Sequence, residues 1–233
     1  MKRRHFVHLC AASTAGACLP DFADAATLTA RQYARTKLVD PRGDALRIGS
    51  LAASTTYVFD YPYCATPCFL LRLDKPVASG IALKTQAGEV YSWEGGIGAH
   101  KSVVAYSAIC AHKMTYPTRQ VSFIGYRDAP SPVAGAGKVI TCCSDRSVYD
   151  PAAGAKVLSG PARQPLATIL LEHDPKADEV FAVGTFGGEM FEEFFRKYDF
   201  RLKLEMGNRA TTSVAGTATV EPLATYSAQW AQC

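Results

Sequence analysis

The sequence lacks the signatures of several large protein classes. Its 25 Lys and Arg residues are scattered rather than gathered into a stripe, so no nucleic-acid-binding surface is expected despite a net charge of +4. It contains no phosphate-binding glycine loop, no paired carboxylates and no nucleophile–base set, so catalysis by the chain itself is not indicated. With 233 residues, 48% of them hydrophobic and 20% charged, the chain is expected to form one globular domain.

Long apolar runs are also missing, even at the N-terminus. Residues 1–25 combine a basic start, including Arg3-Arg4, with a short stretch of small residues and the cleavage pattern Ala23-Asp24-Ala25. This segment resembles a twin-arginine export signal, which predicts a periplasmic protein that is exported already folded. The apolar stretch is too short and too polar for a membrane-spanning helix, although an uncleaved signal would leave the protein associated with the membrane. An ordinary first helix and lipid attachment at Cys18 are the alternatives.

Cysteine is too sparse for a disulfide-rich scaffold. Cys64 and Cys68, in the segment YCATPC, are close enough in sequence to form a disulfide with each other. A buried, unpaired Cys68 is an alternative of equal weight. No role is predicted for Cys233. The six cysteines that follow the signal are Cys64, Cys68, Cys110, Cys142, Cys143 and Cys233.

Short apolar runs rich in β-branched and aromatic residues, separated by Gly, Pro and Asp, dominate residues 55–186. This pattern predicts an antiparallel all-β domain, with a hairpin that turns at Asp174-Pro175-Lys176. A weak helix is predicted over residues 29–38. A stronger one is predicted over residues 187–200, where aromatic residues recur at helical spacing and would pack on the core. Residues from Asn208 onward are expected to lie over the domain as a tail.

Two short segments carry candidate ligands for a metal. Cys110 and His112 follow one strand-like run, and Cys142 and Cys143 follow another in KVITCC. Two cysteine-bearing loops, each preceded by a strand, can hold a metal ion or an iron–sulfur cluster between them. The other histidines after the signal, His100 and His173, are expected in exposed turns.

These segments resemble the two boxes of the Rieske [2Fe-2S] family, which holds its cluster with Cys-x-His in one loop and Cys-x-x-His in the other. The continuation SVYDPAAGAKVLSGPARQPL resembles the rest of the second box, and the similarity covers roughly residues 66–185. It implies an all-β, Rieske-like antiparallel β-sandwich with a cluster-binding loop subdomain, followed here by one C-terminal helix. It also implies that the hydroxyls of Ser147 and Tyr149 donate hydrogen bonds to a bridging sulfide and to a cysteine sulfur.

The second box departs from the family at one ligand. Aligned through SVYD, Cys142 occupies the cysteine position and Asp145 occupies the position of the second histidine. A shift by one residue makes Cys143 the ligand and places Arg146 at the histidine position. The two cysteines that form a disulfide across the cluster in quinol-oxidising Rieske proteins are missing as well, because Thr115 and Ser144 stand at their positions.

The expected ligand set is therefore Cys110, His112, Cys142 and Asp145, with Cys143 as the alternative fourth ligand and loss of the metal as a third possibility. An anionic carboxylate in place of a neutral imidazole favours ferric iron and should lower the potential of a [2Fe-2S] cluster. With Cys143 the set would be Cys₃His, which suits a cluster of lower potential or a zinc ion.

Together, these patterns predict a signal over residues 1–25, an N-terminal extension over 26–65, a Rieske-like domain with its terminal helix over 66–205, and a tail over 206–233. The Rieske resemblance concerns the third of these segments. It implies an electron-transfer subunit that passes single electrons between a redox enzyme or quinol and a c-type cytochrome. One alternative is a Rieske fold without redox function that holds zinc or no metal and acts as an interaction module. The other is a thiol-based redox or metal-handling protein that uses Cys142-Cys143.

Overall fold

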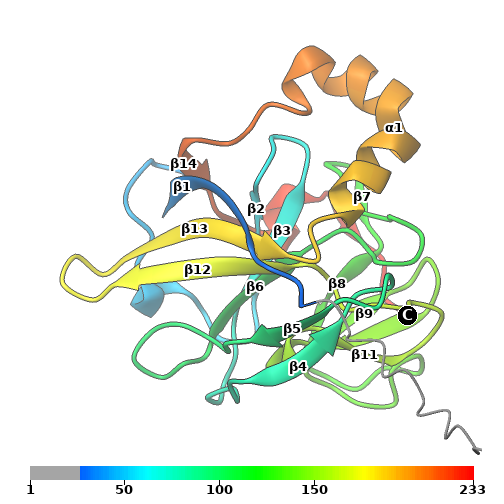
Figure 1. Ribbon diagram of the computed structural model, residues 1–233, viewed down its shortest axis with the longest axis horizontal. Coiled ribbons are helices and arrows are strands. Elements are labelled where there is room, and N and C mark those ends of the chain that lie inside the picture. Colours follow the sequence, from blue (N-terminus) through cyan, green and yellow to red (C-terminus); the bar gives the residue numbers. More distant parts are fainter. Residues whose placement is uncertain (1–26) are drawn as a thin grey trace, which may run out of the picture.

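The structure is a computed structural model and describes residues 27–233, so the predicted export signal lies outside the described residues. Two β-sheets form most of the molecule, and one long helix, α1, stands at one end of them (Figure 1). The predicted all-β class with a C-terminal helix is confirmed. Among residues 27–233, no helix is both long enough and apolar enough to cross a membrane.

The larger sheet has eight strands, and all but one of its neighbouring pairs are antiparallel; β1 and β14 are parallel. In spatial order its strands are β14 (Gly216–Thr219), β1 (Arg31–Val39), β13 (Glu179–Phe186), β12 (Thr168–Asp174), β6 (Val103–Ser107), β3 (Pro67–Arg72), β2 (Thr56–Asp60) and β15 (Glu221–Pro222). The predicted hairpin is formed by β12 and β13.

The smaller sheet has four antiparallel strands: β11 (Lys156–Ser159), β10 (Ser147–Asp150), β9 (Val139–Cys142) and β8 (Ile124–Arg127). Two further pairs lie beside these sheets, the hairpin β4 (Ile81–Lys84) with β5 (Val90–Trp93), and the parallel pair β7 (Val121–Ser122) with β16 (Gln229–Trp230). The helices are α1 (Met190–Met206), the short α2 (Leu223–Tyr226) and 3₁₀ turns at Ile48–Ser50, Pro151–Ala153 and Gly207–Arg209.

The core lies around the central strands β3 and β6. In β3, five consecutive residues are buried, because the strand is covered on both faces. Cys68 is one of them: its thiol is unpaired and donates a hydrogen bond to the carbonyl of Tyr61 at 2.9 Å. Cys64 is also unpaired, so of the two alternatives left open by the sequence, the structure shows the buried, unpaired Cys68 and not the Cys64–Cys68 disulfide.

The helix predicted over residues 29–38 is wrong, because these residues form strand β1. Thr36 and Leu38, two positions apart, are both fully buried, which is the period of a strand and not of a helix. Pairing with β13 then satisfies the backbone, and the guanidinium of Arg35 lies over the ring of Phe181, 3.3 Å from its centroid. Long-range pairing overrides the weak local helical pattern.

Helix α1 packs through the aromatic face that its spacing predicts. Phe191 and Phe194 are buried, and the ring of Tyr116 contacts the rings of Phe194 and Tyr198 at centroid distances of 4.9 and 5.1 Å. Tyr116 follows the first candidate box in the chain, so the helix supports the segment that leaves this box.

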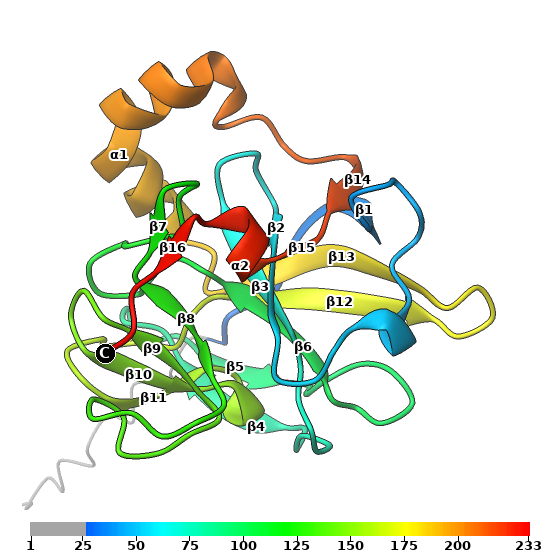
Figure 2. The same cartoon turned by 180° about the vertical axis from the view of Figure 1, so that it is seen from behind.

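The C-terminal tail contributes two strands to the larger sheet and one to the β7–β16 pair before it ends beside the second box. Strands β14 and β15 form the two edges of the larger sheet, and the remaining residues cross the molecule to β7 (Figure 2). The backbone amide of Ala231 donates to the carbonyl of Ser122 at 2.8 Å, and Cys233 forms a disulfide with Cys143, 90 positions away. We refer to residues 227–233 as the C-terminal strap.

Removing the strap disulfide is expected to lower the free energy of unfolding by about 2 to 4 kcal/mol, because the unfolded chain loses the constraint on a long loop. The test is urea unfolding of the Cys143→Ser, Cys233→Ser double variant. The Cys64→Ser variant, which removes an unpaired thiol, is the control and should unfold like the parent. An unchanged unfolding midpoint in the double variant would contradict the disulfide.

Candidate metal centre

The candidate centre lies at the junction of the two sheets. Cys110 and His112 belong to the turn that follows β6 of the larger sheet, whereas Asp145 belongs to the turn between β9 and β10 of the smaller sheet. Cys142 is the last residue of β9 and lies opposite Ser147, the first residue of β10. The hairpin therefore presents the second box towards the first.

The structure brings all four predicted ligands together. The ligand atoms of Cys110, Cys142 and Asp145 lie within 4.8 Å of one another. Oδ2 of Asp145 is 3.2 Å from Sγ of Cys110 and 2.9 Å from Nδ1 of His112. Asp145 thus contacts both predicted ligands of the first box.

The two oxygens of Asp145 have different partners. Oδ1 accepts a hydrogen bond from the backbone amide of Ser147 at 2.9 Å, while Oδ2 faces Cys110 and His112. The amide of Arg146 donates to the carbonyl of Cys142 at 2.7 Å and closes the turn. One oxygen is therefore used to hold the turn, and the other is directed at the candidate ligands.

Exposure differs across the centre. Cys110 and Cys142 are fully buried, and the side chain of Asp145 is 1% exposed. The side chain of His112 is 38% exposed and is the outermost of the four. The imidazole is therefore the group through which the centre meets the surface.

Tyr149 and Ser147 surround the ligands in different ways. The hydroxyl of Tyr149 lies 3.3 Å from Sγ of Cys110 and accepts a hydrogen bond from the amide of Ala111 at 3.3 Å. This is the tyrosine-to-sulfur contact that the resemblance implies. The hydroxyl of Ser147 accepts a hydrogen bond from the amide of Ala162 at 3.2 Å, which ties the second box to the segment after β11.

The surroundings of Cys110 favour its thiolate. A hydrogen bond from the Cys142 thiol lowers the pKa of Cys110, burial opposes this, and the Tyr149 hydroxyl and the amides of His112 and Lys113 lower it further. The same contact with Cys110, together with burial, raises the pKa of Cys142. Cys110 is therefore the sulfur of the pair that favours the thiolate.

Asp145 also favours its charged form. Burial raises the pKa of Asp145, but hydrogen bonds from the amide of Ser147, the two thiols and His112 outweigh it, so the pKa lies below its usual range. Sγ of Cys110 donates a hydrogen bond to Oδ2 of Asp145 at 3.2 Å, so one proton lies between the two groups. Loss of that proton places a thiolate beside a carboxylate, and the two then repel each other unless a cation lies between them. The centre is thus arranged to receive positive charge.

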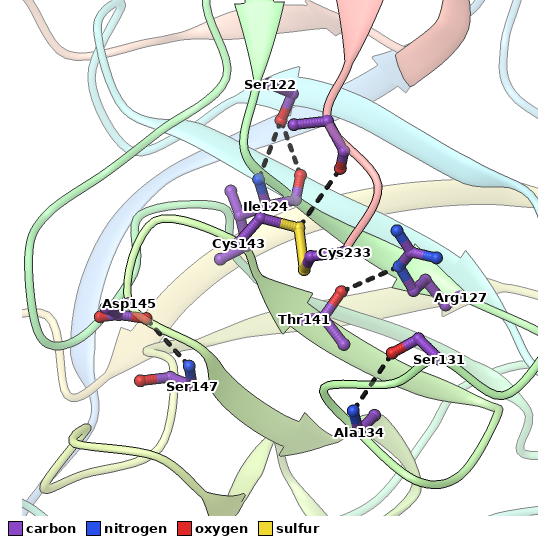
Figure 3. The surroundings of a disulfide bond; sticks show 11 residues. Ser122, Ile124, Arg127, Ser131, Ala134, Thr141, Cys143, Asp145, Ser147 and Cys233 are labelled. Atoms are coloured by element: carbon purple, nitrogen blue, oxygen red, sulfur yellow. Dashed lines mark hydrogen bonds between the residues drawn. A yellow bond between two sulfur atoms is a disulfide. The ribbon is translucent and has the colours of Figure 1, made fainter.

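Cys143 is not part of this donor group, because its sulfur is bonded to Cys233 (Figure 3). Cys142 and Cys143 are consecutive residues at the end of a strand, so their side chains point to opposite sides. Cys142 faces the candidate ligands and Cys143 faces the C-terminal strap. The alternative prediction that Cys143 is the fourth ligand is therefore wrong. The alternative of a redox-active thiol pair formed by Cys142 and Cys143 is wrong for the same reason. The predicted export segment is followed by an even number of cysteines, and this count could have suggested a disulfide partner for Cys233.

The donor set fits a metal group. Two thiols, an imidazole and a carboxylate include the soft sulfur ligands of iron–sulfur and zinc sites, and the pKa values of Cys110 and Asp145 are both shifted towards the deprotonated form that binds a metal. The expectation of an exposed turn is wrong for His173, which belongs to strand β12 and is partly buried; its Nε2 contacts Asp178 at 2.9 Å and not the candidate ligands. His100 is exposed in the turn after β5. The ligand roles themselves remain predictions.

No family model matches the chain. Among solved structures, the soluble domain of the Rieske protein II from Sulfolobus acidocaldarius is similar to it, with 25% sequence identity, a TM-score of 0.46, and coverage of 66% of this chain and 78% of the other.

Gly160 supports the second box by close approach, and its replacement is expected to disturb the centre. Its φ is +91°, and an added Cβ would lie 2.5 Å from Cα of Ser147 and 2.6 Å from the carbonyl oxygen of Arg146. Gly160→Ala should therefore lower the free energy of unfolding by about 2 kcal/mol or more and reduce metal content. Gly135→Ala is the control, because Gly135 also has a positive φ but nothing lies near its Cβ position. Equal effects of the two variants in urea unfolding would refute the close-approach argument.

Proposed function

We propose that the protein is a Rieske-type electron-transfer domain, in which Cys110 and Cys142 hold one iron of a [2Fe-2S] cluster and His112 and Asp145 hold the other. The observation that carries this proposal is the convergence of two cysteine-bearing turns from two different sheets on one buried donor group. The resemblance of the sequence to the two Rieske boxes, and the contact of Tyr149 with Cys110, point the same way.

A bound [2Fe-2S] cluster supplies one reversible electron to such a protein. Burial of Cys110 and Cys142 keeps water away from the sulfurs, and the hydrogen bonds that Cys110 receives stabilise the negative charge of the reduced state. Asp145 adds a fixed negative charge, which favours the oxidised state and lowers the potential. His112, with its partly exposed ring, gives the electron its shortest path to the surface.

We also propose the setting in which this domain acts. The twin-arginine-like segment favours a periplasmic location, where a folded, cofactor-loaded protein would exchange single electrons with a periplasmic oxidoreductase or a c-type cytochrome. The chain would serve as an electron-transfer subunit and not as an enzyme by itself, because its sequence offers no separate catalytic group.

A single zinc ion is the second candidate, and the compactness of the centre favours it. Ligands of one tetrahedral ion lie roughly 3 to 4 Å apart, and the atoms of Cys110, Cys142 and Asp145 all lie within 4.8 Å of one another. Zinc bound by these residues would stabilise the junction of the two sheets and would carry no electrons.

Metal and sulfide content decide between these two functions. We expect the dithionite-reduced protein, purified after export, to give an electron paramagnetic resonance spectrum of low average g, with about two irons and two sulfides per chain. The measurement combines this spectrum with iron, sulfide and zinc analysis of the same sample. Stoichiometric zinc without sulfide or a reduced signal would refute electron transfer and establish the structural alternative.

Replacing Asp145 by histidine is expected to raise the midpoint potential of the cluster, because a neutral imidazole replaces an anionic oxygen. Asp145→Ala should lose most of the cluster. The exposed neighbour Ser144 offers a matched control, since Ser144→His adds a histidine outside the donor group. The measurement is a potentiometric titration followed by electron paramagnetic resonance. If Asp145→His and Ser144→His have the same potential as the parent, Asp145 is not a ligand.

A further inference from the structure

A pair of adjoining cavities lies where α1, the end of β2 and the C-terminal tail meet. Their volumes are about 350 and 470 Å³. Both are lined by Asp60, Cys64, Arg119, Met206 and Tyr226, so we treat them as one site, the tail cavity. Within the described residues, its lining includes none of the candidate metal ligands.

Asp60 is the unusual side chain of the tail cavity. It lines both halves, and none of residues 27–233 donates a hydrogen bond to its carboxylate or forms a salt bridge with it. The side chain of Asp60 is only partly accessible to solvent. Its burial raises the pKa of Asp60 to about 7, and while the positive charge of Arg119 opposes this rise, the negative charge of Glu221 adds to it. A carboxylate held in this way destabilises the fold unless a partner compensates it.

The cation nearest to Asp60 is already engaged. Nη1 of Arg119 lies 2.7 Å from Oε1 of Glu221, and its guanidinium stacks on the ring of Tyr226 at 4.2 Å from the centroid. Glu205, the other carboxylate of the lining, pairs with Arg201 at 2.8 Å. Asp60 is thus the lining carboxylate without a partner.

The remaining walls set the size and polarity of a ligand. Three carboxylates and one guanidinium line the cavity, so its balance of charge favours a cation. Pro67, Tyr116, Leu202 and Met206 add apolar and aromatic surface to the lining. A mixed lining with one unpaired polar group is typical of a small-molecule site in which that group orients the ligand.

We propose that the tail cavity binds a small organic ammonium compound, whose charged nitrogen pairs with Asp60 and whose apolar part packs against Tyr116, Leu202 and Met206. The tail contributes to this site, because Tyr226 of α2 and Glu221 of β15 belong to its lining. The proposal does not depend on the metal centre, and each can fail without the other.

The test is isothermal titration calorimetry of the full, metal-loaded protein at pH 8, with 2-phenylethylamine and the neutral isostere 2-phenylethanol as probes. We expect the amine to bind roughly tenfold more tightly than the alcohol, because only the amine can pair with Asp60. In Asp60→Asn this preference should disappear. Asp44→Asn, which removes an exposed carboxylate outside the cavity, should keep it.

Asp60→Asn must also be shown to fold. Its thermal unfolding midpoint should not fall below that of the parent, because the variant removes an uncompensated carboxylate. Equal affinity for amine and alcohol would show an apolar cavity and overturn the proposal. It would also be overturned by amine binding that is unchanged in a folded Asp60→Asn protein, or by no measurable binding of the amine at millimolar concentration.

Discussion

The carboxylate of Asp145 connects the two main sheets of the molecule. One oxygen is held by the amide of Ser147 in the smaller sheet, and the other contacts Cys110 and His112, which the larger sheet supplies. Because this side chain is almost fully buried, the contacts must all be satisfied at once. The distance between the sheets, the direction of the second box and the charge of the centre all depend on this arrangement.

Much of the fold could be predicted from local sequence. Runs of β-branched and aromatic residues identify β2, β3, β6 and the β12–β13 hairpin, and the aromatic spacing of residues 187–200 identifies most of α1. The failures concern long-range pairing. Strand β1 is stabilised by β13 from the far end of the domain, and Cys143 bonds to a residue 90 positions away. Such partners leave no mark on the local pattern.

The residues of the candidate site could be predicted from the sequence, but the way in which their atoms are arranged could be predicted only in part. Cys110, His112, Cys142 and Asp145 are brought together as the two boxes indicate. The sequence could not show that Asp145 divides its oxygens between a turn and the centre, since this depends on the exact backbone of the β9–β10 turn. It also could not separate Cys142 from Cys143, because their opposite directions follow from where the strand ends.

The disulfide of the C-terminal strap makes a covalent ring of the chain from Cys143 to Cys233. Strands β10 to β13 and the long, largely exposed helix α1 all lie inside that ring. A protease that cuts one peptide bond within it releases no fragment, since both new ends remain attached through the sulfur bridge. Molecules nicked in α1 would therefore keep the mass of the intact chain, apart from one added water, until a reductant separates the pieces.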